Sequence, residues 1–200
     1  EGRSLQAIHS DTGEKLWSFT CVDSQIKSLA VGKNDTVYVG ADYVYALGAK
    51  NGATLWKSES KAGDALAIAP DGTILSTRWV DKYWGKSSKT WNDQQKWFDE
   101  QEYDFCALDP RTGKNIWTKR YKWDQGDDET SSPSMRKFKD INHYAFIDRD
   151  QVANFLCPGP TIMSFDIQNG SPISFYITKK GLATSAPVVG PDGMIYFGTQ

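Results

Sequence analysis

An eleven-residue phrase occurs three times in this chain, and no other feature constrains the fold as strongly. The copies run from Ala7 to Trp17, from Ala46 to Trp56 and from Ala107 to Trp117. Each copy has a glycine six residues after its alanine and a tryptophan four residues after that glycine. A repeated phrase of this length indicates a repeated structural unit, so the architecture can be predicted before any chemistry is considered.

Each phrase reads as a strand, a tight turn and a second strand. The turn needs a residue that tolerates positive φ, and the glycine supplies it without a steric cost. The second strand carries the tryptophan, which is large enough to fill the gap between neighbouring units. We therefore predict that the residues that dock one unit on the next are Gly13, Gly52, Gly113, Trp17, Trp56 and Trp117.

A second phrase precedes the first in each unit, and it is a hairpin signal. Asp71-Gly72 and Asp192-Gly193 stand between short apolar runs, and residues 31–40 follow the same pattern. Such a turn between apolar runs is the strongest short-range indication of a β-hairpin. Two hairpins per unit make a four-stranded antiparallel sheet, and sheets of this kind repeated every ~40–50 residues are propeller blades. We predict an all-β chain: a β-propeller with about four blades.

A fourth unit is degenerate. Aligned on Gly170, it has Ser164 at the alanine position, Asp166 at the position of Asp109, and Ser174 in place of the tryptophan. Its first hairpin is only faintly visible, around residues 138–147. We therefore expect a fourth blade without a docking tryptophan.

The predicted blade boundaries do not coincide with the ends of the chain. We assign one propeller domain over residues 1–200, with blade a formed by 183–200 plus 1–20, blade b by 24–59, blade c by 62–120 with an insertion at 78–103, and blade d by 130–178. The two ends are then halves of one sheet. Three arrangements satisfy this expectation: a closed four-bladed ring, an eight-bladed ring of two chains that exchange ends, and a segment of a longer propeller.

The first phrase resembles the tryptophan-docking repeat of pyrroloquinoline-quinone-type, or quinoprotein dehydrogenase-like, β-propellers. The family pattern is Ala-x-Asp-x-x-Thr-Gly-Lys-x-x-Trp. The third copy fits it at every position, and the other two depart mainly at the aspartate, where His9 and Gly48 stand. The resemblance implies a propeller fold and a periplasmic or extracellular location. It also implies relatives that include non-enzymatic, BamB-like outer-membrane assembly propellers, which bind partners through rim loops.

Composition argues against several classes of function. The net charge is −2, so no general attraction to nucleic acid is expected. No run approaches the ~18 apolar residues of a membrane-spanning helix. The three cysteines, Cys21, Cys106 and Cys157, form no CxxC motif. We find no candidate catalytic residue and no candidate set of metal ligands.

The basic unit is enlarged by three predicted loops, at 78–104, 121–132 and 148–161. The first and third would connect strands two and three of a blade, and the second would connect one blade to the next. Both kinds of connection fall on one rim, opposite the glycine turns. Long loops presented by a rigid sheet commonly carry binding sites, so we predict that binding occurs on this rim.

The first of these loops is rich in aromatic residues. Two interpretations are open: the rings fold the loop back onto its own blade, or one or two of them form an exposed platform for a sugar or a protein. The candidate binding surface consists of Trp79, Tyr83, Trp84, Trp91, Trp97 and Phe98.

Three functions are compatible with these features. The first is a non-enzymatic binding or scaffold module without a cofactor, with a protein or glycan on the loop-rich rim and a homodimer as a further option. The second is part of a quinone-dependent dehydrogenase, which by the resemblance would need pyrroloquinoline quinone, calcium and a catalytic carboxylate, and commonly a Cys-Cys pair that this chain lacks. The third is carbohydrate binding by the Trp-rich loop. We favour the first.

Overall fold

The fold is all-β, as the repeat predicts. The computed structural model describes residues 2–22, 24–33, 35–80, 102–122, 144–157, 161–177 and 185–198. Within these ranges the chain forms strands β1 to β16 and no helix, and therefore no helix that could cross a membrane.

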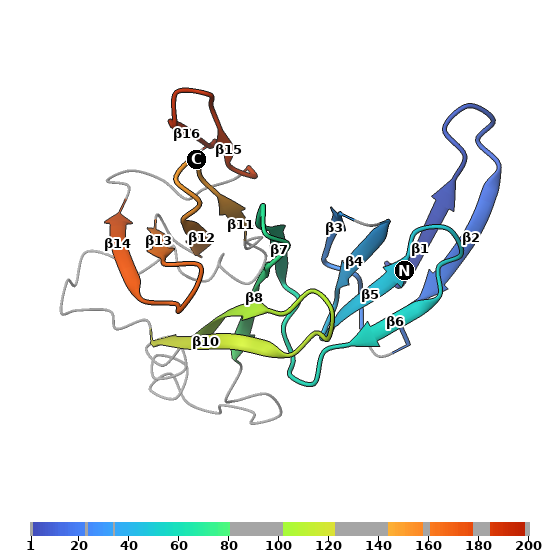
Figure 1. The fold of residues 1–200 in the computed structure, drawn as a ribbon, viewed down its shortest axis with the longest axis horizontal. Helices are drawn as coiled ribbons and strands as arrows, with labels where there is room; N and C mark the ends of the chain where they lie inside the picture. The colour runs from blue at the N-terminus through green and yellow to red at the C-terminus, as the bar shows by residue number, and fades with distance from the viewer. Residues whose placement is uncertain are drawn as a thin grey trace, which may run out of the picture.

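Three four-stranded antiparallel sheets contain most of the strands, and we call them blades b, c and d (Figure 1). Blade b consists of β3 (Ser28–Gly32), β4 (Thr36–Gly40), β5 (Val44–Gly48) and β6 (Thr54–Lys57). Blade c consists of β7 (Ala65–Ile68), β8 (Ile74–Val80), β9 (Glu102–Leu108) and β10 (Asn115–Lys122). Blade d consists of β11 (Tyr144–Ile147), β12 (Ala153–Cys157), β13 (Thr161–Phe165) and β14 (Pro172–Ile177). In each blade, strands that follow one another in sequence are neighbours in the sheet.

The remaining strands form two hairpins. One pairs β1 (Ser4–Ile8) with β2 (Lys15–Thr20), and the other pairs β15 (Val188–Val189) with β16 (Ile195–Tyr196). They are separate two-stranded sheets at opposite ends of an arc (Figure 1). A closed four-bladed ring is therefore not formed in this structure, and the joining of these hairpins into blade a remains a prediction.

The blades follow one another around the arc with their first strands on the inside. β7 lies against β3 of the preceding blade and against β11 of the following blade, while β6, β10 and β14 lie on the outside (Figure 1). The core lies between facing sheets. Tyr38 and Ala46 of blade b pack with Leu108 of blade c, and a larger cluster around Phe105 and Phe155 joins blade c to blade d.

The glycine turn joins the third and fourth strands of a blade. Gly113 and Gly170 have φ of 69° and 70°, in the left-handed region. In the same turns, the carboxylates of Asp109 and Asp166 each accept hydrogen bonds from two backbone N–H groups. Because these bonds favour the charged form, they lower the pKa of Asp109, the bond from Arg111 contributing most. The degenerate unit therefore keeps the turn chemistry of the third copy.

The first hairpin of blade d lies further along the chain than predicted. It is formed by β11 and β12, with residues 148–152 as its tight turn. The predicted hairpin around 138–147 and the predicted rim loop at 148–161 are therefore wrong. Only residues 158–160 separate β12 from β13.

This turn contains no glycine, which is why the sequence pattern does not reveal it. Gln151 adopts the left-handed conformation with φ of 60°, which is uncommon for a residue with a side chain. The carboxylate of Asp148 holds the turn, since it accepts hydrogen bonds from the backbone N–H groups of Asp150 and Val152 and from the side-chain amide of Asn154. An aspartate-centred turn thus replaces the Asp71-Gly72 turn of blade c.

Candidate functional site

The repeat tryptophans lie between blades and contact the glycine turn of the next blade. The indole Nε1–H of Trp17 donates a hydrogen bond to the carbonyl oxygen of Ala49 at 2.7 Å. Its ring lies so close to Gly52 that a Cβ on that residue would be 2.5 Å from the ring. Gly52 is required both for its φ of 69° and for its lack of a side chain.

The next two junctions repeat this arrangement. Trp56 donates to the carbonyl oxygen of Pro110 at 3.0 Å, and Trp117 donates to that of Ile167 at 2.8 Å. Each ring also covers the glycine of the adjoining turn. These contacts hold neighbouring blades together.

The predicted aromatic surface falls almost wholly outside the described residues. Of Trp79, on β8, only the backbone is described, and Tyr83, Trp84, Trp91, Trp97 and Phe98 lie in the undescribed segment 81–101. The topology nevertheless places both ends of that segment, because β8 and β9 are the second and third strands of blade c. The segment therefore connects the second and third strands of blade c, as predicted from the sequence.

The predicted loop boundaries need correction. Residues 78–80 and 102–104 belong to β8 and β9, and residues 121–122 belong to β10. The connections left between described strands are 81–101 within blade c and 123–143 between blades c and d. In an antiparallel meander both start and end on the same rim, and we call this the loop rim.

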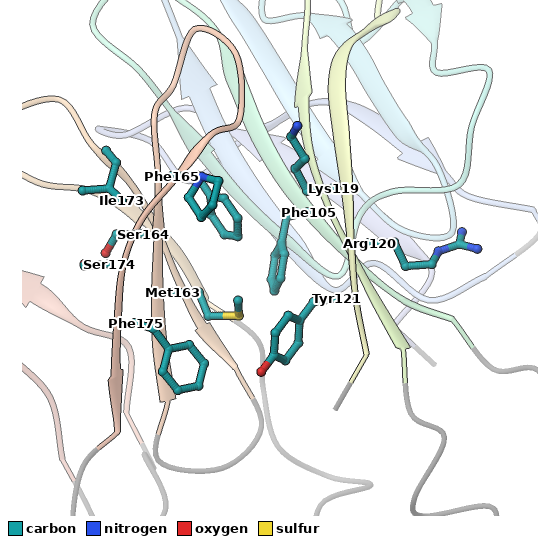
Figure 2. Close-up of a pocket in the computed structure, with 11 residues that line it drawn as sticks. Phe105, Lys119, Arg120, Tyr121, Met163, Ser164, Phe165, Ile173, Ser174 and Phe175 are labelled. Carbon is teal, nitrogen blue, oxygen red and sulfur yellow. The ribbon is translucent and has the colours of Figure 1, made fainter. Parts of the chain in front are cut away.

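A groove of about 510 Å³ lies between the outer strands of blades c and d (Figure 2). The rings of Phe105 and Phe165 are 5.3 Å apart and both are buried, whereas Tyr121 and the half-exposed Phe175 are 6.2 Å apart. The side chains that give the groove its character are Phe105, Lys119, Tyr121, Met163, Phe165 and Phe175. The groove is thus aromatic and apolar over most of its surface.

Charged groups lie at the margin of the groove. Arg120 points away from it in Figure 2, and its guanidinium donates two hydrogen bonds to the buried carboxylate of Asp104, at 2.7 and 2.9 Å. The side chain of Lys119 runs beside Gly170, where a Cβ would be 2.9 Å from its Cε. The arrangement suits an apolar ligand with a polar or acidic group near Lys119.

A large side chain that fills the first junction is replaced by a lysine at this one. In the hairpin β1–β2, Phe19 pairs with Leu5 and packs on Tyr45 of the next blade, with ring centroids 5.4 Å apart. The ladder β9–β10 places Lys119 at the position equivalent to Phe19. Since the lysine extends along the turn of blade d, the space that a phenylalanine ring fills at the first junction stays open here.

The groove extends to the loop rim. Tyr121 lies one residue from the end of β10, Met163 two residues from the start of β13, and Phe175 two residues from the end of β14. Figure 2 shows these three side chains together at one end of the groove. One end of the groove therefore lies at the rim on which the loops predict binding.

Insertions in the repeat do not reveal the groove, because it depends on positions within the blade faces. A signal was present in the repeat alignment. Lys119 stands where the first copy has Phe19, and Phe175 stands where blade b has Lys57. Exchanges between charged and aromatic residues at facing positions could have indicated that this junction differs from the others.

The described residues offer little chemistry beyond this groove. No group of three or more His, Cys, Asp or Glu side chains among them could hold a metal ion. Cys21 and Cys106 are buried thiols without a disulfide. Burial raises the pKa of Cys106 from 9.0 to about 11, which keeps it protonated and unreactive near neutral pH.

Comparison with known proteins supports the fold. Residues 1–78 match the family model described as outer membrane protein assembly factor BamB. No curated protein matches the chain significantly. Among solved structures, BamB from Moraxella catarrhalis has a TM-score of 0.59 at 13% identity, over 98% of this chain and 49% of that one. A protein of unknown function from Bacteroides caccae has a TM-score of 0.60 at 10% identity, over 96% and 60%.

The computationally designed protein Ika8 is similar to the same degree, with a TM-score of 0.61 at 14% identity, over 98% of this chain and 52% of that one. The chain therefore spans between 49% and 60% of these structures. At these identities the likeness concerns the fold alone. Together with the match of residues 1–78, it confirms the resemblance inferred from the repeat: this chain carries a pyrroloquinoline-quinone-type repeat and has a BamB-like β-propeller fold.

Proposed function

We propose that this chain is a non-enzymatic binding module that holds an apolar segment of a protein partner in the groove between blades c and d. The observation that carries the proposal is the space beside Lys119, which is lined by Tyr121 and Phe175 and floored by buried aromatic rings. Pockets of this kind are where aromatic and aliphatic anchor residues of a partner bind most strongly.

The comparisons support a protein as the partner. The matched family model is described as an assembly factor of outer membrane proteins, and such a role involves contact with other polypeptides. On the same ground we propose a periplasmic or extracellular location. The end of β10, from which the connection 123–143 leaves, lies beside the end of the groove at Tyr121.

Binding of short random peptides displayed on phage tests the proposal. Peptides selected on the unmodified chain should contain an aromatic or large aliphatic residue. Phe175→Ser removes one wall of the groove and Lys119→Phe fills it, so each should weaken binding by about tenfold or more. Fluorescence polarisation with the selected peptides measures the loss.

A matched control is Leu55→Ser, since Leu55 is an exposed apolar residue on the outer strand of blade b, away from the groove. It should change peptide affinity by less than about twofold. Tryptophan fluorescence verifies that each variant folds. Peptides that bind all three variants equally well would refute the groove as the binding site.

A further inference from the structure

Two of the docking turns contain an Asn-Gly dipeptide, the sequence in which asparagine deamidates most readily. The residue before the turn glycine is Thr12 in the first copy and Thr112 in the third. In the second copy and in the degenerate unit it is Asn51 and Asn169. These are the two Asn-Gly dipeptides of the sequence, and both glycines have positive φ in the docking turns. Threonine has no side-chain amide, so the other two turns cannot undergo this reaction.

Deamidation at Asn-Gly needs no enzyme and no co-reactant other than water. The amide nitrogen of the glycine loses its proton to a base in solution and attacks the side-chain carbonyl carbon of the asparagine. A C–N bond forms, the bond from that carbon to the side-chain nitrogen breaks, and ammonia leaves after taking up a proton. Water then opens the succinimide at one of its two carbonyl groups, which gives aspartate or isoaspartate. The reaction requires a glycine N–H that is not held in a hydrogen bond and an asparagine side chain that can reach it.

The docked turn withholds both reacting groups of Asn51-Gly52. The N–H of Gly52 donates a hydrogen bond to the carbonyl oxygen of Gly48 at 2.8 Å. The side-chain oxygen of Asn51 accepts the N–H of Ala53 at 3.1 Å, which fixes the side chain in an Asx turn. The ring of Trp17 lies so close to Gly52 that a Cβ there would be 2.5 Å from it. Rotation of this peptide towards the asparagine side chain therefore requires Trp17 to leave.

The turn of Asn169 repeats this arrangement. The N–H of Gly170 donates to the carbonyl oxygen of Asp166 at 2.8 Å, and the N–H of Ser171 donates to the side-chain oxygen of Asn169 at 2.7 Å. Trp117 covers Gly170, where a Cβ would be 2.7 Å from the ring. Both asparagines are exposed, so water can reach them. The geometry of the docked turn, and not burial of the asparagine, therefore opposes the reaction.

We propose that Asn51 and Asn169 are deamidation sites that the docked tryptophans protect, so that opening of either junction is recorded as aspartate or isoaspartate in the turn. Isoaspartate places an additional methylene in the backbone, which changes the spacing between the glycine and the carbonyl oxygen that the tryptophan contacts. A junction that opens and reacts therefore does not close again in the same way. The reaction rate follows the population of the open junction, because local opening and closing are fast relative to the chemical step.

The two sites differ in how firmly their turns are held. The carboxylate of Asp166 accepts two further backbone N–H groups in the turn of Asn169. Gly48 stands at the equivalent position before Asn51 and has no side chain to do so. Opening of the turn of Asn51 breaks fewer hydrogen bonds, so Asn51 should react faster than Asn169 in the folded chain.

Peptide mapping by mass spectrometry, after incubation of the chain at mildly alkaline pH, tests the proposal. Both sites should react at least about tenfold more slowly in the folded chain than in concentrated urea. Trp17→Leu should speed the reaction at Asn51 by about tenfold or more and change that at Asn169 by less than about twofold. Trp117→Leu should have the reverse effect, so each variant is the control for the other.

Asn51→Thr is a matched control for the consequence of the reaction, because threonine occupies this position in two of the other turns. After an incubation that lowers the urea midpoint of the unmodified chain, this variant should retain more of its midpoint and release less ammonia. A folded chain that reacts as fast as the unfolded chain would overturn the proposal. So would tryptophan variants that leave both rates unchanged or raise both equally. None of these outcomes depends on the groove between blades c and d.

Discussion

Alanine at Gly52 or Gly113 should destabilise the chain more than alanine at Gly13, and this comparison measures the tryptophan contact. The three glycines have φ of 69°, 69° and 70°, so the left-handed conformation costs each alanine about the same, ~1–2 kcal/mol. Their surroundings differ. A Cβ on Gly13 would have nothing within 4 Å, whereas on Gly52 or Gly113 it would be 2.5 Å from a tryptophan ring.

That contact is too short to keep, so the ring or the backbone has to move. Inserting a carbon into a packed site costs about 1–3 kcal/mol. Trp17 and Trp56 cannot move away freely, because each would lose its hydrogen bond to the next blade. We expect a loss of unfolding free energy of about 1–2 kcal/mol for Gly13→Ala and about 2–5 kcal/mol for Gly52→Ala and Gly113→Ala.

Thermal and urea unfolding followed by tryptophan fluorescence provide the assay. In a chain of this size, 1 kcal/mol lowers the midpoint by about 2–4 °C. A double-mutant cycle isolates the contact: in a Trp17→Leu background, Gly52→Ala should cost no more than Gly13→Ala. Equal losses for the three alanine variants in the unmodified background would refute the idea that the glycines are needed for tryptophan docking.

Three further predictions concern the stability of the folded chain. Lys119→Phe should raise the unfolding free energy by about 1–2 kcal/mol in urea titration, because the new ring fills the groove as Phe19 fills its junction. Gln151→Gly should add up to about 1 kcal/mol by relieving a φ of 60°, whereas a loss would show that the side chain stabilises the turn. Burial raises the pKa of Cys106 from 9.0 to about 11, so the folded chain retains a proton that the unfolded chain loses. The stability that this difference provides is present below pH 9 and is lost as the pH rises towards 11, by on the order of 3 kcal/mol. Cys106→Ala should flatten this part of the pH profile.

The features predicted correctly from the sequence are those that depend on local conformation. Gly113 must have positive φ, so a glycine recurs at this position in every copy, while Asp109, which accepts backbone N–H groups of the same turn, recurs only as Asp166. The Asp71-Gly72 hairpin is equally local. Because the turn between the third and fourth strands is formed by a glycine in every blade, the repeat alone predicts a propeller of four-stranded blades.

The predictions that failed concern places where one blade forms a turn or a junction with residues that the other blades do not use. In blade d, Asp148 and Gln151 form the turn that Asp71-Gly72 forms in blade c, so the sequence pattern predicts a loop where this hairpin lies. The groove could not be predicted from one strand at a time, because it depends on Lys119 of blade c facing Phe175 of blade d. The aromatic loop predicted as a binding surface lies outside the described residues and stays a prediction.

Blade d lacks the tryptophan with which the other units dock on the glycine turn that follows them. Ser174 occupies that position, whereas Trp17, Trp56 and Trp117 each donate a hydrogen bond to a carbonyl oxygen of the next turn. This difference can be predicted from the sequence, because a single residue decides whether the contact forms.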